Sequence, residues 1–465
     1  MNRFLSITTA ILAVSIAVAI TSLSTFEGGP HNGPRPIPQE AVPIWQTSEL
    51  HWFVRFFMGY LYGVLGHVAT MTICPSVIDW HNQKEVLLAQ ECMKRGRSAE
   101  DIDLAPLEWM FDVNDVFIDR PQGERESGDP LRVTLLKKQK SPDIANTPND
   151  PLILFMHGGG FTVRAFTKTQ SMFIFNKLLK LYGDGTMMDS ATFAMVEYRL
   201  APEHAYPAAT NDCLLALNHL VKEMGLGKGG VHVAGSSAGG TLAMETTLNA
   251  LNIVDTFFVD EPVVPFPTTA TADNNKEGEW TVDSPSVRRY AYSRMPPVSW
   301  LEWSLKAYTG IETVTVSGEE DNLTLGTMTT NVDITGGAMT ASEWIQKRNN
   351  DIDSTTSLLP SMIPLPRLIL VTAMGDPLRD GGLAFKEVYA EALRKEKELL
   401  EQNDSKIAKA KGQRADGLPI SKAKHFETYS GHVGFYLFEP ASFSIIMKEW
   451  YDEMYDVWQS RSRKR

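Results

Sequence analysis

Short apolar runs alternate with longer stretches of helical periodicity from about residue 111 onward. Apolar runs without polar alternation are typical of strands in a parallel sheet that is covered on both faces. Between these runs, helical patterns are predicted at 208–224, 241–250 and 383–400. The pattern therefore predicts an α/β protein with a mostly parallel sheet and helices on both faces. The predicted parallel strands are Leu152–Met156, Thr192–Val196, Val231–Ala234, Val254–Val259 and Leu368–Thr372.

Two further runs, Val113–Ile118 and Leu131–Lys137, flank a polar turn and predict a pair of strands ahead of the parallel ones. Two polar stretches interrupt the alternation, at 268–360 and at 402–419. The first is long enough to form a cap inserted between two strands, and the second predicts a surface loop. We therefore expect one α/β domain over residues 110–460 with a cap insertion at about 268–360.

The first 24 residues differ from the rest of the chain. From Phe4 to Leu23 there is no charged residue, and Arg3 precedes the run. A cleaved signal peptide and an uncut membrane anchor both fit such a segment. In either case we expect residues 1–24 to direct the chain into the secretory pathway, as a secreted or a membrane-anchored protein.

A second apolar stretch runs from Phe56 to Cys74 without Asp, Glu, Lys or Arg. Gly59 and Gly63 within it have the spacing that helix dimers use in membranes. The aromatic residues at 52–57 favour instead a helix that lies on an apolar surface. We expect residues 25–109 to form a helical segment that contributes to the cap or contacts a membrane.

Composition excludes several classes of protein. The 465 residues are 43% hydrophobic and 22% charged, which is ordinary for a folded protein and excludes collagen-like, disordered and coiled-coil chains. The formal net charge of −12 gives no basic footprint for nucleic acid, so we expect no nucleic-acid partner. The three cysteines are too few for a disulfide scaffold, although Cys74 and Cys92 can pair.

The segment Gly235-Ser-Ser-Ala-Gly239 has the G-x-S-x-G form and lies between a predicted strand and a predicted helix. A nucleophile elbow needs this context, because the glycines let the backbone pack closely while the hydroxyl of Ser237 stands above the sheet. The alternative is a glycine-rich turn that carries a solvent-exposed serine. The strand and helix on either side favour Ser237 as a nucleophile.

Three glycines, Gly158, Gly159 and Gly160, follow His157 at the end of a predicted strand. Successive glycines allow backbone N–H groups to point into a cleft without side chains in the way. Together with the N–H of Ala238, they form a candidate oxyanion hole. A flexible loop is the alternative. We expect His157 itself to brace the loop rather than to transfer protons.

A candidate acid, Asp376, follows the predicted strand at 368–372, at the edge of the sheet where α/β active sites form. Pro377 stiffens the turn and helps to fix where this carboxylate points. Asp380 is the competing acid, but it lies where a helix begins and is placed to cap it. We therefore expect Asp376 to be the functional carboxylate.

The candidate base is His432, which completes the chain order Ser, Asp, His that is known for hydrolases of this architecture. His425, one predicted strand earlier, is the alternative. In the expected mechanism His432 removes the proton of Ser237, which attacks an ester carbonyl and forms an acyl-enzyme. Asp376 holds the imidazole in the useful tautomer and stabilises its charged form.

Five motifs make the chain similar to a known family, the hormone-sensitive-lipase-like (GDXG) carboxylesterases, over roughly residues 110 to 455. They occur in the family's order: His157-Gly-Gly-Gly-Phe, Glu197-Tyr-Arg-Leu-Ala-Pro-Glu-His, Gly235-Ser-Ser-Ala-Gly-Gly, Asp376-Pro-Leu-Arg-Asp and Gly431-His-Val-Gly-Phe. The resemblance implies an α/β-hydrolase fold with a helical cap. It also implies hydrolysis of small-molecule or lipid carboxylic esters without a cofactor or a metal.

By matching positions, the resemblance assigns the triad and the oxyanion hole to the residues already singled out. The second of the five motifs is structural rather than catalytic in the family. One position departs from the pattern, because the family usually has Asp before the nucleophile and this chain has Ser236. The departure changes the charge beside the elbow and leaves the triad in place.

Two alternative functions stay open. An amidase or deacetylase is one, because the same triad cleaves activated amides, and the apolar N-terminal segment resembles the layout of membrane-anchored arylacetamide deacetylases. The other is a non-catalytic small-ligand receptor, since plant hormone receptors resemble this family but have lost the catalytic histidine. All three triad positions are occupied here, which favours an enzyme.

Overall fold

The computed structural model describes the part of the chain that corresponds to the predicted α/β domain. The segments predicted as a signal or anchor (1–24) and as an N-terminal helical segment (25–109) lie outside it, as do most of the insertion at 268–360 and the cysteines 74 and 92. No helix in the described part is both long and apolar enough to cross a bilayer. The described residues are 111–121, 129–139, 150–164, 167–183, 185–264, 266–267, 280–281, 285–290, 301, 304–305, 307–308, 365–402 and 422–463.

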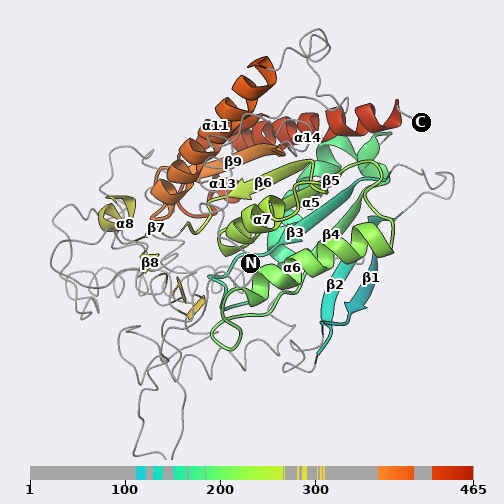
Figure 1. Cartoon of the computed structure of the whole chain (residues 1–465), viewed down its shortest axis with the longest axis horizontal. Helices are drawn as coiled ribbons and strands as arrows, with labels where there is room; N and C mark the ends of the chain where they lie inside the picture. Colours follow the sequence, from blue (N-terminus) through green and yellow to red (C-terminus); the bar gives the residue numbers. More distant parts are fainter. Residues whose placement is uncertain are drawn as a thin grey trace, which may run out of the picture.

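An eight-stranded sheet forms the centre of the described domain, in the order β1-β2-β4-β3-β5-β6-β9-β10 (Figure 1). β1 pairs antiparallel with β2 and β2 with β4, and the other neighbours are parallel, which confirms the predicted mostly parallel sheet. The strands are β1 (Phe111–Ile118), β2 (Leu131–Lys138), β3 (Leu152–Met156), β4 (Thr192–Val196), β5 (Val231–Ser236), β6 (Thr256–Asp260), β9 (Arg367–Ala373) and β10 (Ala423–Thr428).

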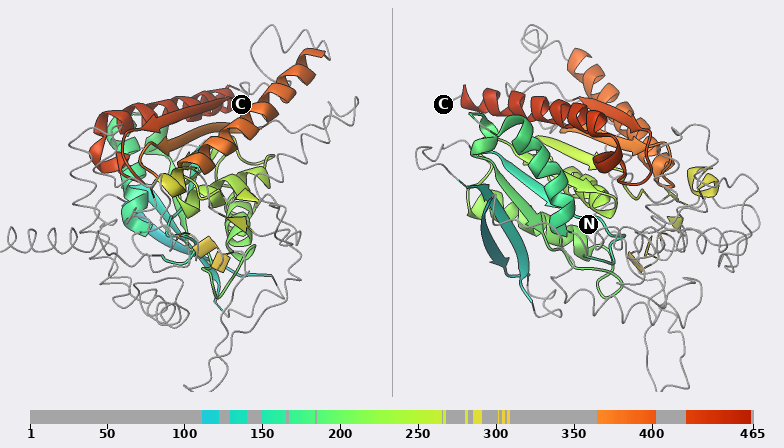
Figure 2. Two further views of the ribbon diagram at one scale, coloured as in Figure 1. Left: turned by 90° about the vertical axis from the view of Figure 1, so that its left-hand side faces the viewer. Right: turned by 180° about the vertical axis from the view of Figure 1, so that it is seen from behind.

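Helices cover both faces of this sheet, as Figures 1 and 2 show. Alternate side chains of a strand point to opposite faces, and in β3 this places Leu154 in one apolar core and Phe155 in the other. The first core lies under α6 (Ala208–Asn218), α7 (Ala238–Leu248) and α11 (Arg379–Gln402). The second lies under α5 (Thr167–Tyr182), α13 (Phe435–Phe438) and α14 (Pro440–Ser462). Strands buried on both faces explain the uninterrupted apolar runs of the sequence.

Three helices differ from their predicted boundaries, and α11 begins four residues before the predicted start at 383. α7 begins at Ala238, three residues before the predicted start, because β5 turns directly into the helix at Ser237. The predicted helix at 208–224 is α-helical only to Asn218 and continues as a π-helical turn, His219–Glu223. Small elements also lie outside the sheet: β7 (Phe266–Pro267) pairs with β8 (Trp280–Thr281), and α8 (Pro285–Arg289) follows them.

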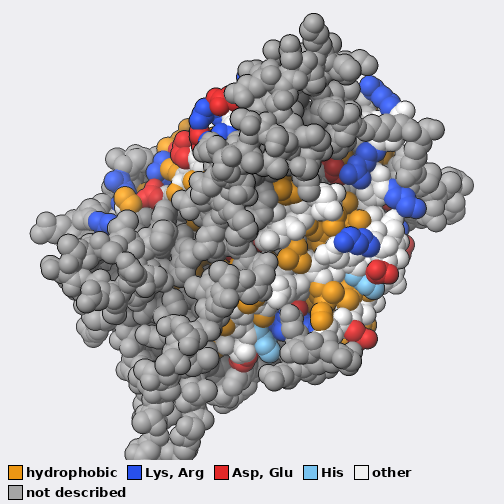
Figure 3. Space-filling view, viewed as in Figure 1, with side chains coloured by type: hydrophobic (Ala, Val, Ile, Leu, Met, Phe, Trp, Pro, Cys, Tyr) orange, Lys and Arg blue, Asp and Glu red, His pale blue; other side chains and the backbone are white. Residues whose placement is uncertain are grey.

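The strand register brings several strand ends to one edge of the sheet. Met156 of β3 is opposite Gly235 of β5, and Asp260 of β6 is opposite Val371 of β9. The carboxyl ends of parallel strands are where α/β proteins build their sites. On the outer surface, the described side chains visible in Figure 3 carry both signs of charge.

Candidate active site

The turn between β5 and α7 holds Ser237 in a backbone conformation that residues other than glycine rarely adopt. Its φ is 57° and its ψ is −125°, and its N–H donates a 2.8 Å hydrogen bond to the carbonyl of Asp260. A Cβ on Gly235 would lie 2.0 Å from the carbonyl oxygen of Gly239, and one on Gly239 would lie 2.1 Å from that of Met156. Both glycines of the motif are therefore required by close backbone approach, as a nucleophile elbow requires.

The structure brings Ser237, His432 and Asp376 together. His432 Nε2 is 3.0 Å from Ser237 Oγ, and His432 Nδ1 is 2.9 Å from Asp376 Oδ2. The three residues come from the turn after β5, the turn after β9 and the loop after β10. When the Nδ1–H donates to the carboxylate, Nε2 is left to accept the proton of the serine.

Both competing residues lie elsewhere. His425 is on β10, with its Nε2 2.8 Å from Thr372 Oγ1 on β9. Asp380 lies in the first turn of α11, where its Oδ2 accepts a 2.7 Å hydrogen bond from the N–H of Ser286 in α8. Its carboxylate therefore joins α11 to α8. From the sequence we expected Asp380 to cap its own helix instead. Asp376, and not Asp380, contacts His432.

The glycine loop after β3 leaves several N–H groups available. Gly158 donates its N–H to Gln170 Oε1 at 2.7 Å, so this donor is already used inside the protein. Gly159 has a φ of +121°, and a Cβ there would lie 2.3 Å from the carbonyl oxygen of Val163. No hydrogen bond among the described residues takes up the N–H of Gly159, Gly160 or Ala238. Of the four predicted oxyanion positions, these three retain a donor.

The histidine that begins this loop is fully buried. The ring of His157 stacks on that of Tyr198 with centroids 4.3 Å apart, and the Tyr198 hydroxyl donates to the His157 carbonyl at 2.6 Å. Burial lowers the pKa of His157 to about 3, so the ring is neutral at physiological pH. These contacts fit the bracing role expected for His157.

Two acidic residues that the sequence did not single out lie at the end of β6. Asp260 Oδ2 accepts hydrogen bonds from Ser236 Oγ at 2.8 Å and from the Tyr436 hydroxyl at 2.6 Å. Glu261 Oε2 is 3.1 Å from His432 Nδ1. The signal that selected Asp376, an acid just past a predicted strand, is also present at 260–261. A carboxylate therefore lies beside the elbow after all, supplied by the neighbouring strand instead of by position 236.

Burial and mutual repulsion shift the pKa values of these groups. Burial raises the pKa of Asp260 to about 6. Burial, followed by repulsion from Asp260 and Asp376, raises the pKa of Glu261 well above its usual range. Burial alone would lower the pKa of His432, but the carboxylates of Asp376 and Glu261 raise it well above its ordinary value. Strongly shifted pKa values of this kind are concentrated at functional sites.

One group of potential metal ligands occurs among the described residues. Atoms of Glu261, Asp376 and His432 lie within 4.8 Å of one another. In this group the imidazole Nδ1 faces both carboxylates at hydrogen-bond distance. A proton on Nδ1 can therefore be shared in hydrogen bonds with both carboxylate oxygens, and this arrangement needs no metal ion.

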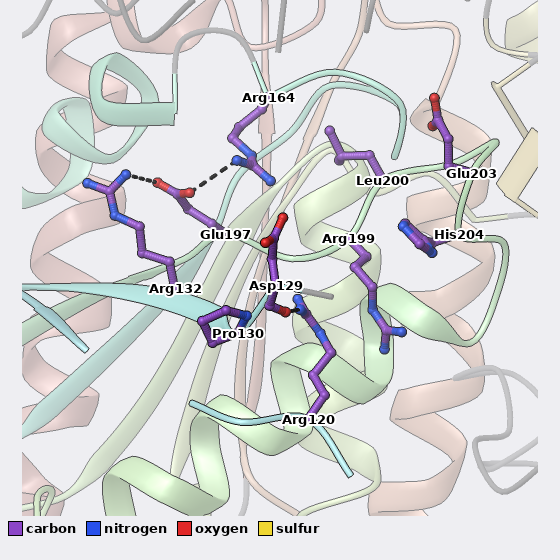
Figure 4. Close-up of a pocket in the computed structure, with 10 residues that line it drawn as sticks. All are labelled: Arg120, Asp129, Pro130, Arg132, Arg164, Glu197, Arg199, Leu200, Glu203 and His204. Carbon is purple, nitrogen blue, oxygen red and sulfur yellow. Dashed lines mark hydrogen bonds and ion pairs between the residues drawn. The ribbon is translucent and has the colours of Figure 1, made fainter. Parts of the chain in front are cut away.

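A polar pocket of about 490 Å³ lies apart from these residues and shares none of its lining with the triad (Figure 4). Four arginines line it, and each is paired with an acid of the protein. Arg132 and Arg164 flank Glu197, as the dashed lines of Figure 4 show, while Asp212 binds Arg120 and Arg199. The pocket lining is Arg120, Asp129, Pro130, Arg132, Arg164, Glu197, Arg199, Leu200, Glu203 and His204.

Comparison with known proteins gives a family match over 153–406, more than half of the chain, to the alpha/beta hydrolase fold. Esterase LipI of Mycobacterium tuberculosis is 32% identical over 151 residues, which are 31% of this chain and 40% of that protein. The versiconal hemiacetal acetate esterase stcI of Emericella nidulans is 29% identical over 145 residues, 30% of this chain and 46% of that protein.

A receptor is also among the similar proteins. The gibberellin receptor GID1 of Oryza sativa is 30% identical over 105 residues, 22% of this chain and 28% of the receptor. The matches thus span less than half of the length of these curated relatives. Among solved structures, a bacterial heroin esterase covers 85% of this chain and 97% of its own, with a TM-score of 0.49 and 20% identity.

Proposed function

The chain belongs to the alpha/beta hydrolase fold family that its five motifs resemble, and we propose that it is a serine hydrolase that cleaves carboxylic esters through Ser237, His432 and Asp376. One observation carries the proposal. His432 lies between a serine on a strained strand-to-helix turn and a buried carboxylate, at 3.0 Å and 2.9 Å. The esterase relatives support the same reaction class.

In the proposed reaction, His432 Nε2 takes the proton of Ser237 as Oγ attacks the ester carbonyl. The Nδ1–H, held by Asp376, fixes the tautomer in which Nε2 is basic, and the carboxylate stabilises the imidazolium. His432 then donates the proton to the leaving alcohol, and an acyl-serine remains. A water deprotonated by the same nitrogen releases the acid and restores the enzyme.

The negative oxygen of the tetrahedral intermediate needs preorganised donors. The N–H groups of Gly159, Gly160 and Ala238 have no acceptor among the described residues, Ala238 follows Ser237 directly, and Gly158 of the glycine loop approaches Ser237 closely. Donors held in place before the reaction stabilise charge without reorganisation, and one such donor is typically worth about 10²–10³ in kcat. Gly158 instead joins the loop to Gln170.

A small-ligand receptor is the second candidate, because a gibberellin receptor is among the similar proteins. The intact hydrogen-bond chain from Ser237 to Asp376 favours the enzyme over the receptor. An amidase or deacetylase uses the same residues, so substrate assays distinguish it from an esterase. Entry into the secretory pathway and membrane contact through residues 25–109 stay predictions from the sequence.

The test is hydrolysis of p-nitrophenyl esters of increasing acyl length, beside matched anilides, by wild type and Ser237→Ala. Wild type should cleave the esters faster than the anilides. Loss of the nucleophile of a comparable triad costs on the order of 10⁶ in kcat, so the variant should be inactive and folded. A folded variant with a tenth of wild-type turnover would show that Ser237 is not the nucleophile. Tight binding of one ligand without any turnover by wild type would favour the receptor.

A further inference from the structure

A second carboxylate lies at the imidazole nitrogen that Asp376 contacts. His432 Nδ1 is 2.9 Å from Asp376 Oδ2 and 3.1 Å from Glu261 Oε2. Both distances allow a hydrogen bond, so one N–H group can be shared between the two acceptors. The two acids follow neighbouring parallel strands, β6 and β9, and both are buried. The imidazole thus has an acidic partner on two separate elements of the sheet.

We propose that Glu261 is a second positioning residue for His432, sharing the Nδ1 hydrogen bond with Asp376 and stabilising the imidazolium that forms when Ser237 loses its proton. The inference rests on the proposed function, because it assigns Glu261 a role in that same reaction. Glu261 is not placed to touch the substrate carbonyl in this scheme, and it acts only through the histidine.

The backbone around the two residues supports this role. Glu261 has a φ of 45° and Val433, next to the histidine, has a φ of 48°, both in the left-handed region that non-glycine residues rarely adopt. The N–H of Val433 donates to Glu261 Oε2, so the glutamate also fixes the loop that carries His432. Residues held in such conformations are concentrated at functional sites.

The other oxygen of the glutamate argues against a purely structural role. Glu261 Oε1 is buried and has no hydrogen-bond partner among the described residues. A buried carboxylate with one oxygen unpaired is unfavourable for folding. The Val433 N–H needs only one acceptor oxygen, so this hydrogen bond alone does not account for a buried acid at position 261.

Several titratable groups face His432, and all of those on its Nδ1 side are acidic. They are Asp376 after β9, Asp260 and Glu261 at the end of β6, and Tyr436 on α13, which binds Asp260, with the hydroxyl of Ser237 on the Nε2 side. The Glu261 carboxylate raises the pKa of His432. Removing its charge should therefore lower that pKa, so the neutral, basic form of the imidazole should persist to lower pH.

The first experiment is the pH profile of kcat/KM for Glu261→Gln with p-nitrophenyl acetate. We expect kcat to fall about tenfold, which is the size of one charge-assisted hydrogen bond, with KM within about threefold. The acid limb of kcat/KM should move to lower pH, and Glu261→Asp, which retains the charge, should keep that limb near the wild-type position. Glu396→Gln is the control, because Glu396 is also buried and also accepts a backbone N–H, from Leu365 at 3.0 Å.

The second experiment begins with the other acid, Asp376. Replacing the only acid of a comparable triad by Asn costs about 10⁴ in kcat. If Glu261 shares the Nδ1 hydrogen bond, Asp376→Asn should lose only about 10², and the double variant with Glu261→Gln should lose about 10⁴. Removing Glu261 should therefore cost more in the Asp376→Asn background than in wild type.

An unmoved acid limb in folded Glu261→Gln, or the full 10⁴ loss in Asp376→Asn alone, would overturn the role of Glu261. Either result, together with an active wild type that depends on Ser237, leaves the proposed function in place. A wild type that hydrolyses no ester of the panel overturns the proposed function and this inference together.

Discussion

Two clusters of buried charge in this domain are balanced in opposite ways. In the arginine cluster, Asp212 binds Arg120 at 2.9 Å and Arg199 at 3.0 Å, so one acid faces two cations. In the acid cluster, three carboxylates, Asp260, Glu261 and Asp376, lie around the single imidazole of His432. Both clusters are buried, yet only in the second do like charges raise one another's pKa values, as Asp260 and Asp376 do for Glu261.

The difference indicates what each cluster does. The arginine cluster joins Arg120 after β1 and Arg199 after β4 to Asp212 on α6, and its charges are satisfied within the protein. The excess of carboxylates in the acid cluster shifts pKa values, as at Asp260 and Glu261. Paired charges of opposite sign hold elements together, whereas strongly shifted pKa values are typical of groups that exchange protons.

The largest effect should follow the loss of the one imidazole in the acid cluster. His432→Val removes the base, so Ser237 keeps its proton and cannot form the acyl-enzyme at a useful rate. We expect turnover to be lost while equilibrium binding of a slow ester analogue stays within a few-fold. The measurements are turnover of p-nitrophenyl acetate and binding of the analogue, each made on the folded variant.

The control for this change is His425→Val. His425 is half-buried on β10 and contacts Thr372 at 2.8 Å, so its loss should leave turnover close to wild type. Equal turnover in His432→Val and wild type would mean that the base lies elsewhere, and His425 would then be the next candidate.

The arginine cluster should respond in stability instead of turnover. Asp212→Ala leaves Arg120 and Arg199 buried with the acid they share removed, a change that typically costs about 3–5 kcal/mol. The free energy of unfolding in urea should fall by that amount, while kcat per folded molecule should remain close to wild type. An Asp212→Ala variant with unchanged stability and impaired kcat would contradict a purely structural role of the arginine cluster.

The pH dependence of stability should come from the acid cluster. The pKa of Asp260 is raised from 3.8 to about 6 by burial, so the folded protein binds more protons than the unfolded chain between these values. Stability from this group is therefore present at low pH and is lost as pH rises through about 6. Relative to wild type, Asp260→Asn should gain stability as pH rises from about 4 to about 7. If the difference in free energy of unfolding between Asp260→Asn and wild type stays constant over this pH range, the pKa of Asp260 is not raised in the folded protein.

Local pattern sufficed for the strands and for placing Ser237 and Asp376 at strand ends. Each parallel strand was predicted within a few residues, because strands buried on both faces are uninterrupted apolar runs. Ser237 and Asp376 each directly follow such a strand, so their positions were also predictable. No local sequence pattern predicts which strand ends become neighbours in the sheet. Glu261 and Asp376 are 115 positions apart in the chain and meet only because β6 pairs with β9.

Strand pairing also explains the environment of Ser236, the residue before the proposed nucleophile. Ser236 suggested a lost carboxylate, but its hydroxyl donates to Asp260 of the adjacent strand at 2.8 Å. The register that sets Ser236 opposite Asp260 is a property of strand pairing. The residue type at position 236 alone therefore does not show that a carboxylate of the adjacent strand contacts it.

The smallest expected effect tests whether the segment that carries Arg199 supports the glycine loop, because Tyr198 directly precedes Arg199 in the chain and contacts His157 at the start of the loop. Tyr198→Phe keeps the ring stack but removes the hydrogen bond to the His157 carbonyl, which should lower the free energy of unfolding by about 1 kcal/mol. Turnover should stay within about twofold, because the N–H donors of the loop keep their positions. Tyr389→Phe is the matched control, since its hydroxyl also donates to a buried carbonyl, that of Pro366, at 2.6 Å. If Tyr198→Phe loses tenfold or more in kcat with unchanged stability, while Tyr389→Phe does not, catalysis depends on the hydrogen bond by which Tyr198 holds the glycine loop.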